Sequence, residues 1–305
     1  MQTHYITTTQ ELEKYCQEIQ QTSNIIALDT EFIRRYTYFP KLCLVQVCYY
    51  FNNQYKTLLI DPLSKELDLK SFTEILQNPN IKKVVHSAVQ DIEAFYKSNG
   101  KIAKGIEDSQ ILASYSGFRA RIGYSELIKN LFDIELDKGQ QRSAWQKRPL
   151  TTAQRTYAAD DVKYLLKTYS ILTEKLEQKQ NTKNYREELN KLYNQNFIQN
   201  MITNSWKRFK VFAKDKNKKG KYPKLIKALC IFREKHAIKI DSIRANVFND
   251  DFIKFMAFHR PLTIKKAVKL YNIEKRYKPN LRLPRNQKIF KKTIRYVWYS
   301  FFNFF

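Results

Sequence analysis

Cysteine is scarce in this chain of 305 residues, and the spacing that metal-binding cysteine pairs require is absent. None of Cys16, Cys43, Cys48 and Cys230 is separated from another by two residues, and Cys43 and Cys48 lie in an apolar run. We therefore expect reduced, structural thiols and neither a disulfide framework nor a zinc cluster.

Long apolar segments are also absent. No stretch of 18 apolar residues occurs, and the start, MQTHYITTTQELEKY, lacks the basic region followed by an apolar stretch that marks a secretory signal. We therefore expect a protein that neither spans a membrane nor is secreted, and we predict a cytoplasmic location.

Acidic residues are few relative to basic ones. The chain holds 55 Lys and Arg against 29 Asp and Glu, and residues 201–305 alone hold 28 basic and 6 acidic side chains. This excess predicts a polyanionic partner that binds to the C-terminal third. Nucleic acid is the first candidate and an anionic membrane the second. The alternative is that lysine-rich usage only solvates the surface.

The first half of the chain contains several short runs typical of strands. Residues 25–32, 42–50 and 56–60 are rich in β-branched and aromatic residues, and 81–85 is a shorter run of the same kind. Ser87 followed by Gln90 has the spacing of a capping box and predicts a helix to about Lys97.

A second capping pattern, Thr151 with Gln154, precedes a long periodic apolar stripe and predicts a helix of about 25 residues. Strands followed by mixed strands and helices indicate an α/β domain over residues 1–180. Residues 181–204 are expected to form a helical connector, 205–285 a small helical bundle in which Asn249 starts a helix, and 286–305 a basic, aromatic tail of unknown role.

Four acids and one tyrosine in the first domain have spacings that suit a shared site. Asp29 and Glu31 are two apart on a predicted strand, so both point to one face. Asp91 falls in the first turn of a helix, and Tyr157 and Asp161 are one helical turn apart. Carboxylate oxygens suit Mg²⁺ or Mn²⁺, although each pattern alone is a weak signal.

The segments around these acids resemble, in order, the three exonuclease motifs of the ribonuclease D family. They are ALDTEFIRRYTYFPKLCLVQV, VVHSAVQDIEAFY and RSAWQKRPLTTAQRTYAADDVKYLL, and together they span about residues 25–170. The resemblance implies a DnaQ-like, ribonuclease H-like mixed sheet flanked by helices. One departure is Ala144, which stands where the family usually has an acid before Trp145.

The same resemblance implies a DEDDy site for 3′-to-5′ hydrolysis. Asp29, Glu31, Asp91 and Asp161 would hold two divalent metal ions, Mg²⁺ or Mn²⁺, and Tyr157 would position the attacking water. A phenol with a pKa near 10 is a poor base at neutral pH, so orienting the water is its expected role. The adjacent Asp160 is expected to be a solvated surface acid.

Other residues near these motifs are candidates for substrate binding, each with an ordinary structural alternative. Phe32, with Tyr36 and Phe39, offers rings on which single-stranded ends can stack, or is core. The remaining candidates are Gln46, which is equally a strand residue, His86, whose structural alternative is favoured, and Arg142 and Arg148, which bind phosphates or are solvated.

Residues from Trp206 to about Tyr277 resemble an HRDC domain, a helical nucleic-acid-binding module, with softer motifs. Lys207, Arg208, Lys210, Lys218, Lys219, Lys265 and Lys266 would bind phosphates without reading sequence. The family resemblance implies a 3′-to-5′ exoribonuclease that matures tRNA precursors at single-stranded 3′ ends, with no obligate protein partner. The alternatives are a DNA-directed exonuclease of the same superfamily and a catalytically silent RNA-binding protein.

Overall fold

The computed structural model describes residues 2–209, 221–261 and 263–274, together with residues 282, 288, 289, 291, 293 and 295. The chain divides into two compact units. The sheet unit comprises Met1–Ile33 and Pro40–Gln195, and the helical unit comprises Arg34–Phe39 and Asn196–Phe305.

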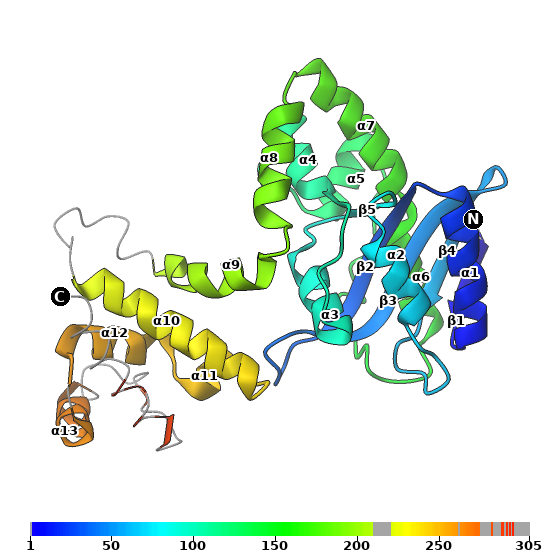
Figure 1. Cartoon of the computed structure of the whole chain (residues 1–305). Coiled ribbons are helices and arrows are strands. Elements are labelled where there is room, and N and C mark those ends of the chain that lie inside the picture. The colour runs from blue at the N-terminus through cyan, green and yellow to red at the C-terminus, as the bar shows by residue number, and fades with distance from the viewer. Residues whose placement is uncertain are drawn as a thin grey trace. The chain divides into compact units, whose positions relative to one another are not determined.

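The sheet unit is built on one mixed, six-stranded sheet with the strand order β1-β4-β3-β2-β5-β6 (Figure 1). Strand β2 lies near the middle, antiparallel to β3 and parallel to β5, and its first three residues are paired on both sides. Strand β4 is antiparallel to β3, while the outer strands β1 and β6 pair in parallel with β4 and β5. The strands span Gln2–Ile6 (β1), Ile25–Ile33 (β2), Lys41–Phe51 (β3), Gln54–Ile60 (β4), Lys82–Val85 (β5) and Ile106–Asp108 (β6).

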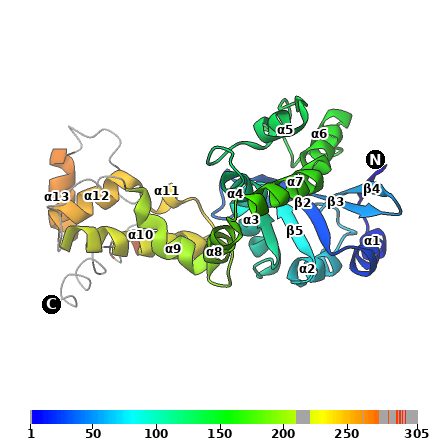
Figure 2. The ribbon, with the colours of Figure 1, turned by 90° about the horizontal axis from the view of Figure 1, so that it is seen from above.

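Helices cover both faces of this sheet. Figure 2 shows α1 and α2 on one side and α5 and α6 on the other. Buried side chains of β2, β3 and β5 form one apolar core with residues from α4 to α8, which fixes the helices on that face. The helices are Thr9–Thr22 (α1), Lys70–Gln77 (α2), Val89–Asn99 (α3), Ser109–Tyr115 (α4), Tyr124–Phe132 (α5), Thr152–Lys163 (α6), Leu165–Gln178 (α7) and Thr182–Leu192 (α8).

The predicted α/β class and the four predicted strands are confirmed, with ends shifted by at most two residues. The sequence patterns did not indicate β1, β6, α1, α2, α4 or α5. Strand β6 has only three residues, which is too short for a periodicity to be recognised.

The capping box at the start of the last motif is confirmed. The Thr151 hydroxyl accepts from the Gln154 amide, and the Gln154 side chain accepts from the Thr151 amide. The single long helix predicted after it is wrong, because the structure has α6 and α7 with a break at Tyr164. The two helices pack on different neighbours: α6 packs on β2, β3 and β4, and α7 packs mainly on α4. One straight helix would not make both sets of contacts.

The predicted cap at Ser87 is also wrong. Helix α3 begins after Ala88, which makes no side-chain cap, and Ser87 has a positive φ of 66°. The buried Asp108 carboxylate accepts from the amides of Ser87 and Ala88, at 3.1 and 3.0 Å. An acid on a neighbouring strand therefore accepts from the Ser87 amide, which the Gln90 side chain would satisfy in a capping box.

The helical unit contains the predicted small bundle. The apolar stripe of Leu225, Ile226 and Leu229 is buried on α10, and the Asn249 side chain caps α12 as expected. Its elements are Phe197–Asn204 (α9), the 3₁₀ turn Ser205–Arg208, Lys221–Lys239 (α10), Arg244–Val247 (α11), Asp250–His259 (α12) and Ile264–Glu274 (α13). The predicted tail over 286–305, apart from isolated positions, and Lys210, Lys218 and Lys219 lie outside the described residues.

The compact units divide the chain at other positions than the expected domain end near residue 180. The sheet unit continues through α8 to Gln195, because Tyr185 and Leu189 of α8 are buried in its core. The short segment Arg34–Phe39, which follows β2 directly, belongs to the helical unit.

All four cysteines are buried and unpaired, as the sequence predicted. Among the residues that the structure describes, no helix combines the length and the apolar character needed to cross a membrane.

Candidate active site

Strand β2 presents two acids on one face of the sheet. Asp29 and Glu31 are separated by one residue, so the alternation of the strand places both partly buried carboxylates on the same side. A register shift between Glu31 and Phe32 follows immediately. Both acids are paired with β3, Asp29 with Gln46 and Glu31 with Leu44, whereas β5 pairs only with the start of β2.

Asp91 reaches the same region from the first turn of α3. Its carboxylate is buried and accepts a hydrogen bond of 2.5 Å from the hydroxyl of Thr30, which lies between the two strand acids. The helix N-terminus is a favourable place for a negative charge. Thr30 therefore ties the α3 carboxylate to the strand that carries the other two.

Helix α6 brings the fourth acid and the tyrosine. Tyr157 and Asp161 lie one turn apart, and α6 packs across β2, β3 and β4. The Tyr157 ring lies 6.0 Å from the ring of Trp145, which is buried with Leu44 and Leu59. Trp145 is thus packed in the core although Ala144 replaces the usual acid before it.

The carboxylates act strongly on one another. Burial, followed by the charges of Asp91, Asp161 and Glu31, raises the pKa of Asp29 well above its usual value. Burial and the charges of Asp161 and Asp91 raise the pKa of Glu31 to about 9. Burial also raises the pKa of Asp91 and of Asp161, and the Tyr157 hydroxyl counteracts part of the rise at Asp161. The structure therefore brings together all five residues expected to form the site.

This cluster has the character of a cation site. Among the described residues, no lysine or arginine is one of the groups that act most strongly on any of the four acids. Hard carboxylate oxygens are the ligands that Mg²⁺ and Mn²⁺ prefer. In the described part of the chain no group of three or more acidic, cysteine or histidine side chains is arranged so that it could hold a metal ion as it stands. The donor set fits a divalent ion in its chemistry.

Gln46 lies next to this cluster. It is the cross-strand partner of Asp29, so the two side chains share a face of the sheet. Its side chain is completely buried, and neither its amide oxygen nor its amide nitrogen has a hydrogen-bond partner in the described residues. A buried amide without a partner is costly.

His86 is engaged by the protein itself. Its Nδ1 lies 2.9 Å from the Ser109 hydroxyl and its Nε2 lies 3.0 Å from the carbonyl oxygen of Ile122. Burial lowers the pKa of His86. These contacts support the structural alternative that the sequence favoured.

Tyr124, the first residue of α5, was not indicated by any sequence pattern. Its ring lies 5.5 Å from that of His86, and its buried hydroxyl has no hydrogen-bond partner in the described residues. Burial, then the charges of Asp161 and Asp29, raise its pKa, which places this phenol beside the acid cluster. No local signal marks it, because its position depends on how α5 packs.

The two arginines expected to bind phosphates differ in environment. Arg142 is exposed. All three guanidinium nitrogens of Arg148 donate within the protein, to both carboxylate oxygens of Asp61 at 2.5 and 2.6 Å and to the carbonyl oxygens of Cys43, Trp145 and Lys147. We therefore propose a structural role for Arg148 in place of the phosphate contact.

The three aromatic residues expected to stack on the substrate also differ. Phe32 is partly buried, Tyr36 has 68% of its surface exposed, and Phe39 is buried. Tyr36 and Phe32 thus remain candidates for stacking, whereas Phe39 has the environment of a core residue. Asp160 is partly exposed and lies 3.7 Å from Lys163, as expected of a surface acid.

Comparison with known proteins adds to this picture. The family model described as 3′-5′ exonuclease matches residues 3–177. Ribonuclease D of Jannaschia sp. (strain CCS1) is 36% identical over 261 residues, 86% of this chain and 66% of that protein, and ribonuclease D of Sphingobium indicum is 30% identical over 282 residues, 92% of this chain and 70% of that protein. The chain spans about two thirds of the length of the first of these relatives.

A solved structure is similar along nearly the whole chain. Escherichia coli RNase D, described as an exoribonuclease involved in structured RNA processing, covers 99% of this chain with a TM-score of 0.72 and 26% identity, and 76% of that protein is matched. The similarity agrees with the mixed sheet flanked by helices that the motifs implied.

Proposed function

The chain belongs to the 3′-5′ exonuclease family and, within it, to the ribonuclease D family, and on that premise we propose that it shortens RNA from the 3′ end. The observation that carries this proposal is the convergence of the acids of β2, α3 and α6 with the Tyr157 phenol. Each cleavage would break the bond between phosphorus and the 3′ oxygen and release a nucleoside 5′-monophosphate.

We propose that Asp29, Glu31, Asp91 and Asp161 hold two divalent ions, Mg²⁺ or Mn²⁺. When bound, such ions lower the pKa of water, offset the negative charge of the phosphate and stabilise the leaving 3′ oxygen. The repulsion that the charges of Asp91 and Asp161 exert on Asp29 and Glu31 supports this assignment.

The other residues of the site orient the reactants. Tyr157 would hold the attacking water through its hydroxyl, because an ordinary phenol keeps its proton at neutral pH. The amide of Gln46, which lies beside Asp29 and has no hydrogen-bond partner in the described residues, would bind the terminal nucleotide or a water. Phe32 and Tyr36 would stack on bases, which tolerates any base sequence.

We propose that the substrates are precursors of tRNA with single-stranded 3′ ends. We also propose that the protein acts in the cytoplasm and needs no obligate protein partner. The similarity to ribonuclease D proteins supports RNA as the substrate. The basic C-terminal third, in which Lys265 and Lys266 are exposed, supports sequence-independent phosphate contacts by an HRDC-like unit.

One assay tests this function against its alternatives. Purified protein is incubated with RNA and DNA of equal length, labelled at the 5′ or the 3′ end, in Mg²⁺, in Mn²⁺ and in EDTA. We expect metal-dependent, stepwise shortening of RNA, with 3′ label released at once as mononucleotide. Equal or faster loss of DNA would favour a DNA-directed exonuclease, and binding without shortening in either metal would favour a silent RNA-binding protein.

A further inference from the structure

The segment between β2 and β3 is fastened to the helical unit through a buried tyrosine. The Tyr38 side chain is 1% exposed, and its hydroxyl donates to the Glu234 carboxylate of α10 at 2.5 Å. The Tyr38 amide donates to the Asp241 carboxylate at 3.3 Å. Both bonds belong to the helical unit, which includes residues 34–39.

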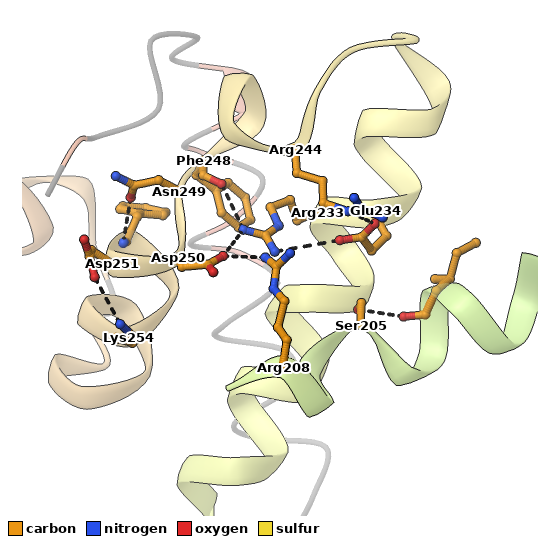
Figure 3. Close-up of polar contacts among 12 residues, drawn as sticks. Ser205, Arg208, Arg233, Glu234, Arg244, Phe248, Asn249, Asp250, Asp251 and Lys254 are labelled. Carbon is orange, nitrogen blue, oxygen red and sulfur yellow. Dashed lines mark hydrogen bonds and ion pairs between the residues drawn. The ribbon is translucent and has the colours of Figure 1, made fainter. Parts of the chain in front are cut away.

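Glu234 is the centre of a charged cluster. Its side chain is fully buried, and the oxygen that accepts from Tyr38 also accepts from Arg244 Nε at 2.6 Å. Figure 3 shows Glu234 between Arg244 and the buried Arg233, which lies 3.7 Å away. The guanidinium of Arg244 also lies over the Tyr38 ring, 4.9 Å from its centroid. A carboxylate buried this completely needs its donors, so the position of Tyr38 is strongly determined.

The cluster continues into the rest of the helical unit. Arg233 donates to the Asp250 carboxylate at 2.7 Å and to the carbonyl oxygen of Phe248, and Arg208 pairs with the same carboxylate (Figure 3). Helices α10, α11 and α12 are thereby linked through charges that hold one another in place. Tyr38 is consequently attached to a network of charged side chains and not to a single one.

The segment so fastened presents two exposed side chains. Arg35 and Tyr36 are both exposed, and the Arg35 guanidinium lies 5.3 Å from the centroid of the Tyr36 ring. A cation beside an exposed aromatic face is suited to a nucleotide, because the ring stacks on a base while the charge meets a phosphate. Arg35 follows Glu31, one of the acids of the proposed site, by four positions.

We propose that Tyr38 is a positioning residue: through Glu234 it holds the segment 34–39 so that Arg35 and Tyr36 bind single-stranded RNA. The segment then contributes to turnover even of an RNA of about five nucleotides. This inference rests on the proposed function.

The test compares Tyr38→Phe with the wild type on RNA of about five and about 25 nucleotides, under single-turnover conditions in Mg²⁺. Losing a hydrogen bond to a buried charge should lower kcat/KM by about five- to ten-fold on both lengths. Tyr50→Phe is the matched control, because it removes the hydroxyl of a half-exposed tyrosine in the sheet unit and should change neither rate. Thermal unfolding of each variant accompanies the kinetics.

A double-mutant cycle separates positioning from a merely structural role. Tyr36→Ala alone should also slow both substrates, and adding Tyr38→Phe to it should cost less than about two-fold more, because the anchor acts through the side chains it presents. Independent effects that multiply would overturn the proposal. So would a Tyr38→Phe effect confined to the longer RNA, or none on either. If the wild type itself shortens neither RNA, it is the proposed function that fails.

Discussion

At the scale of single residues, the acid cluster is expected to lower the stability of the fold while providing the ligands for catalysis. Burial and the charges of Asp91 and Asp161 raise the pKa of Asp29 and of Glu31, so these carboxylates repel one another in the absence of a cation. Removing one charge should therefore relieve the fold while disabling the site, a combination often found where function imposes local strain.

Asp161→Asn tests this directly. We expect the rate of RNA shortening in Mg²⁺ to fall at least about 100-fold, because a neutral amide is a poor ligand for a hard cation. Its unfolding temperature without metal should be equal to or above that of the wild type. Asp160→Asn, at the neighbouring surface acid, is the control and should leave the rate unchanged. Near-wild-type trimming by Asp161→Asn would remove this residue from the metal site.

Tyr157→Phe should act more mildly. The variant keeps the ring that packs near Trp145 and loses only the hydroxyl beside Asp161, so we expect roughly a ten- to 100-fold lower rate with unchanged stability. The concentration of Mg²⁺ that gives half the maximal rate should not change. A shift in that concentration would show that the hydroxyl organises the carboxylates instead of the water.

Lys83 offers a pH-dependent test away from the site. Its side chain is fully buried on β5, and burial, followed by the charge of Lys104, lowers its pKa from 10.5 to about 7. Between these values the unfolded chain binds the proton that the folded chain has released, so stability should rise with pH. The destabilisation caused by the buried Lys83 is absent above about pH 10.5. It grows by at most about 1.4 kcal/mol for each pH unit between about pH 10.5 and about pH 7.

Lys83→Met should abolish that slope. Urea unfolding at several pH values between about 7 and 10 should give a flatter stability profile for the variant and a higher stability near neutral pH. Retention of the wild-type slope in Lys83→Met would assign the pH dependence to another group. The single hydrogen bond of the ammonium, 2.5 Å to the carbonyl oxygen of Asn78, is what the variant gives up.

At the scale of elements, the start of α6 is fastened to the sheet by one ion pair. The pair joins Arg148 to Asp61, which follows β4 directly. Burial raises the pKa of Asp61, but hydrogen bonds from Arg148 and Tyr5 outweigh burial and lower it. Arg148 also bonds the carbonyl oxygen of Cys43 on β3 at 2.6 Å. The loop before α6 is thereby held against two strands, upstream of Tyr157 and Asp161.

Arg148→Lys distinguishes this structural role from the phosphate contact that the sequence suggested. A lysine cannot make the bidentate pair or reach three carbonyl groups, so we expect a loss of about 2 kcal/mol in the free energy of unfolding. KM for RNA should change less than stability does. Arg119→Lys, in an exposed pair with Glu126, is the control and should leave stability unchanged. An unchanged stability with a raised KM would restore the phosphate contact.

Much of the secondary structure that carries the site was predictable from the sequence. Alternating apolar residues identified the central strands, and the capping box at Thr151 identified the start of α6. The break at Tyr164 and the role of Asp108 at the start of α3 were not, because each depends on packing partners that are distant in sequence.

At the scale of the whole molecule, positive charge is concentrated in the C-terminal third. Replacing the exposed Lys265 and Lys266 by alanine should weaken binding of an RNA of about 25 nucleotides at about 50 mM salt and reduce the slope of log affinity against log salt by about one to two. The control double variant Lys101→Ala with Lys183→Ala removes equal charge from exposed positions of the sheet unit. Equal effects of the two double variants would show a general charge effect and no localised grip.

The sequence by itself determined the local geometry of the candidate site: a shared strand face for Asp29 and Glu31, one helical turn between Tyr157 and Asp161, and motifs that identify the family. These features are readable because strand and helix periods are properties of neighbouring residues. Only the tertiary structure decided that Arg148 is held by Asp61, that Gln46 lies unpartnered beside Asp29, and that Tyr38 is bonded to Glu234, 196 positions away. Those pairings depend on where packing places distant segments, which no local pattern encodes.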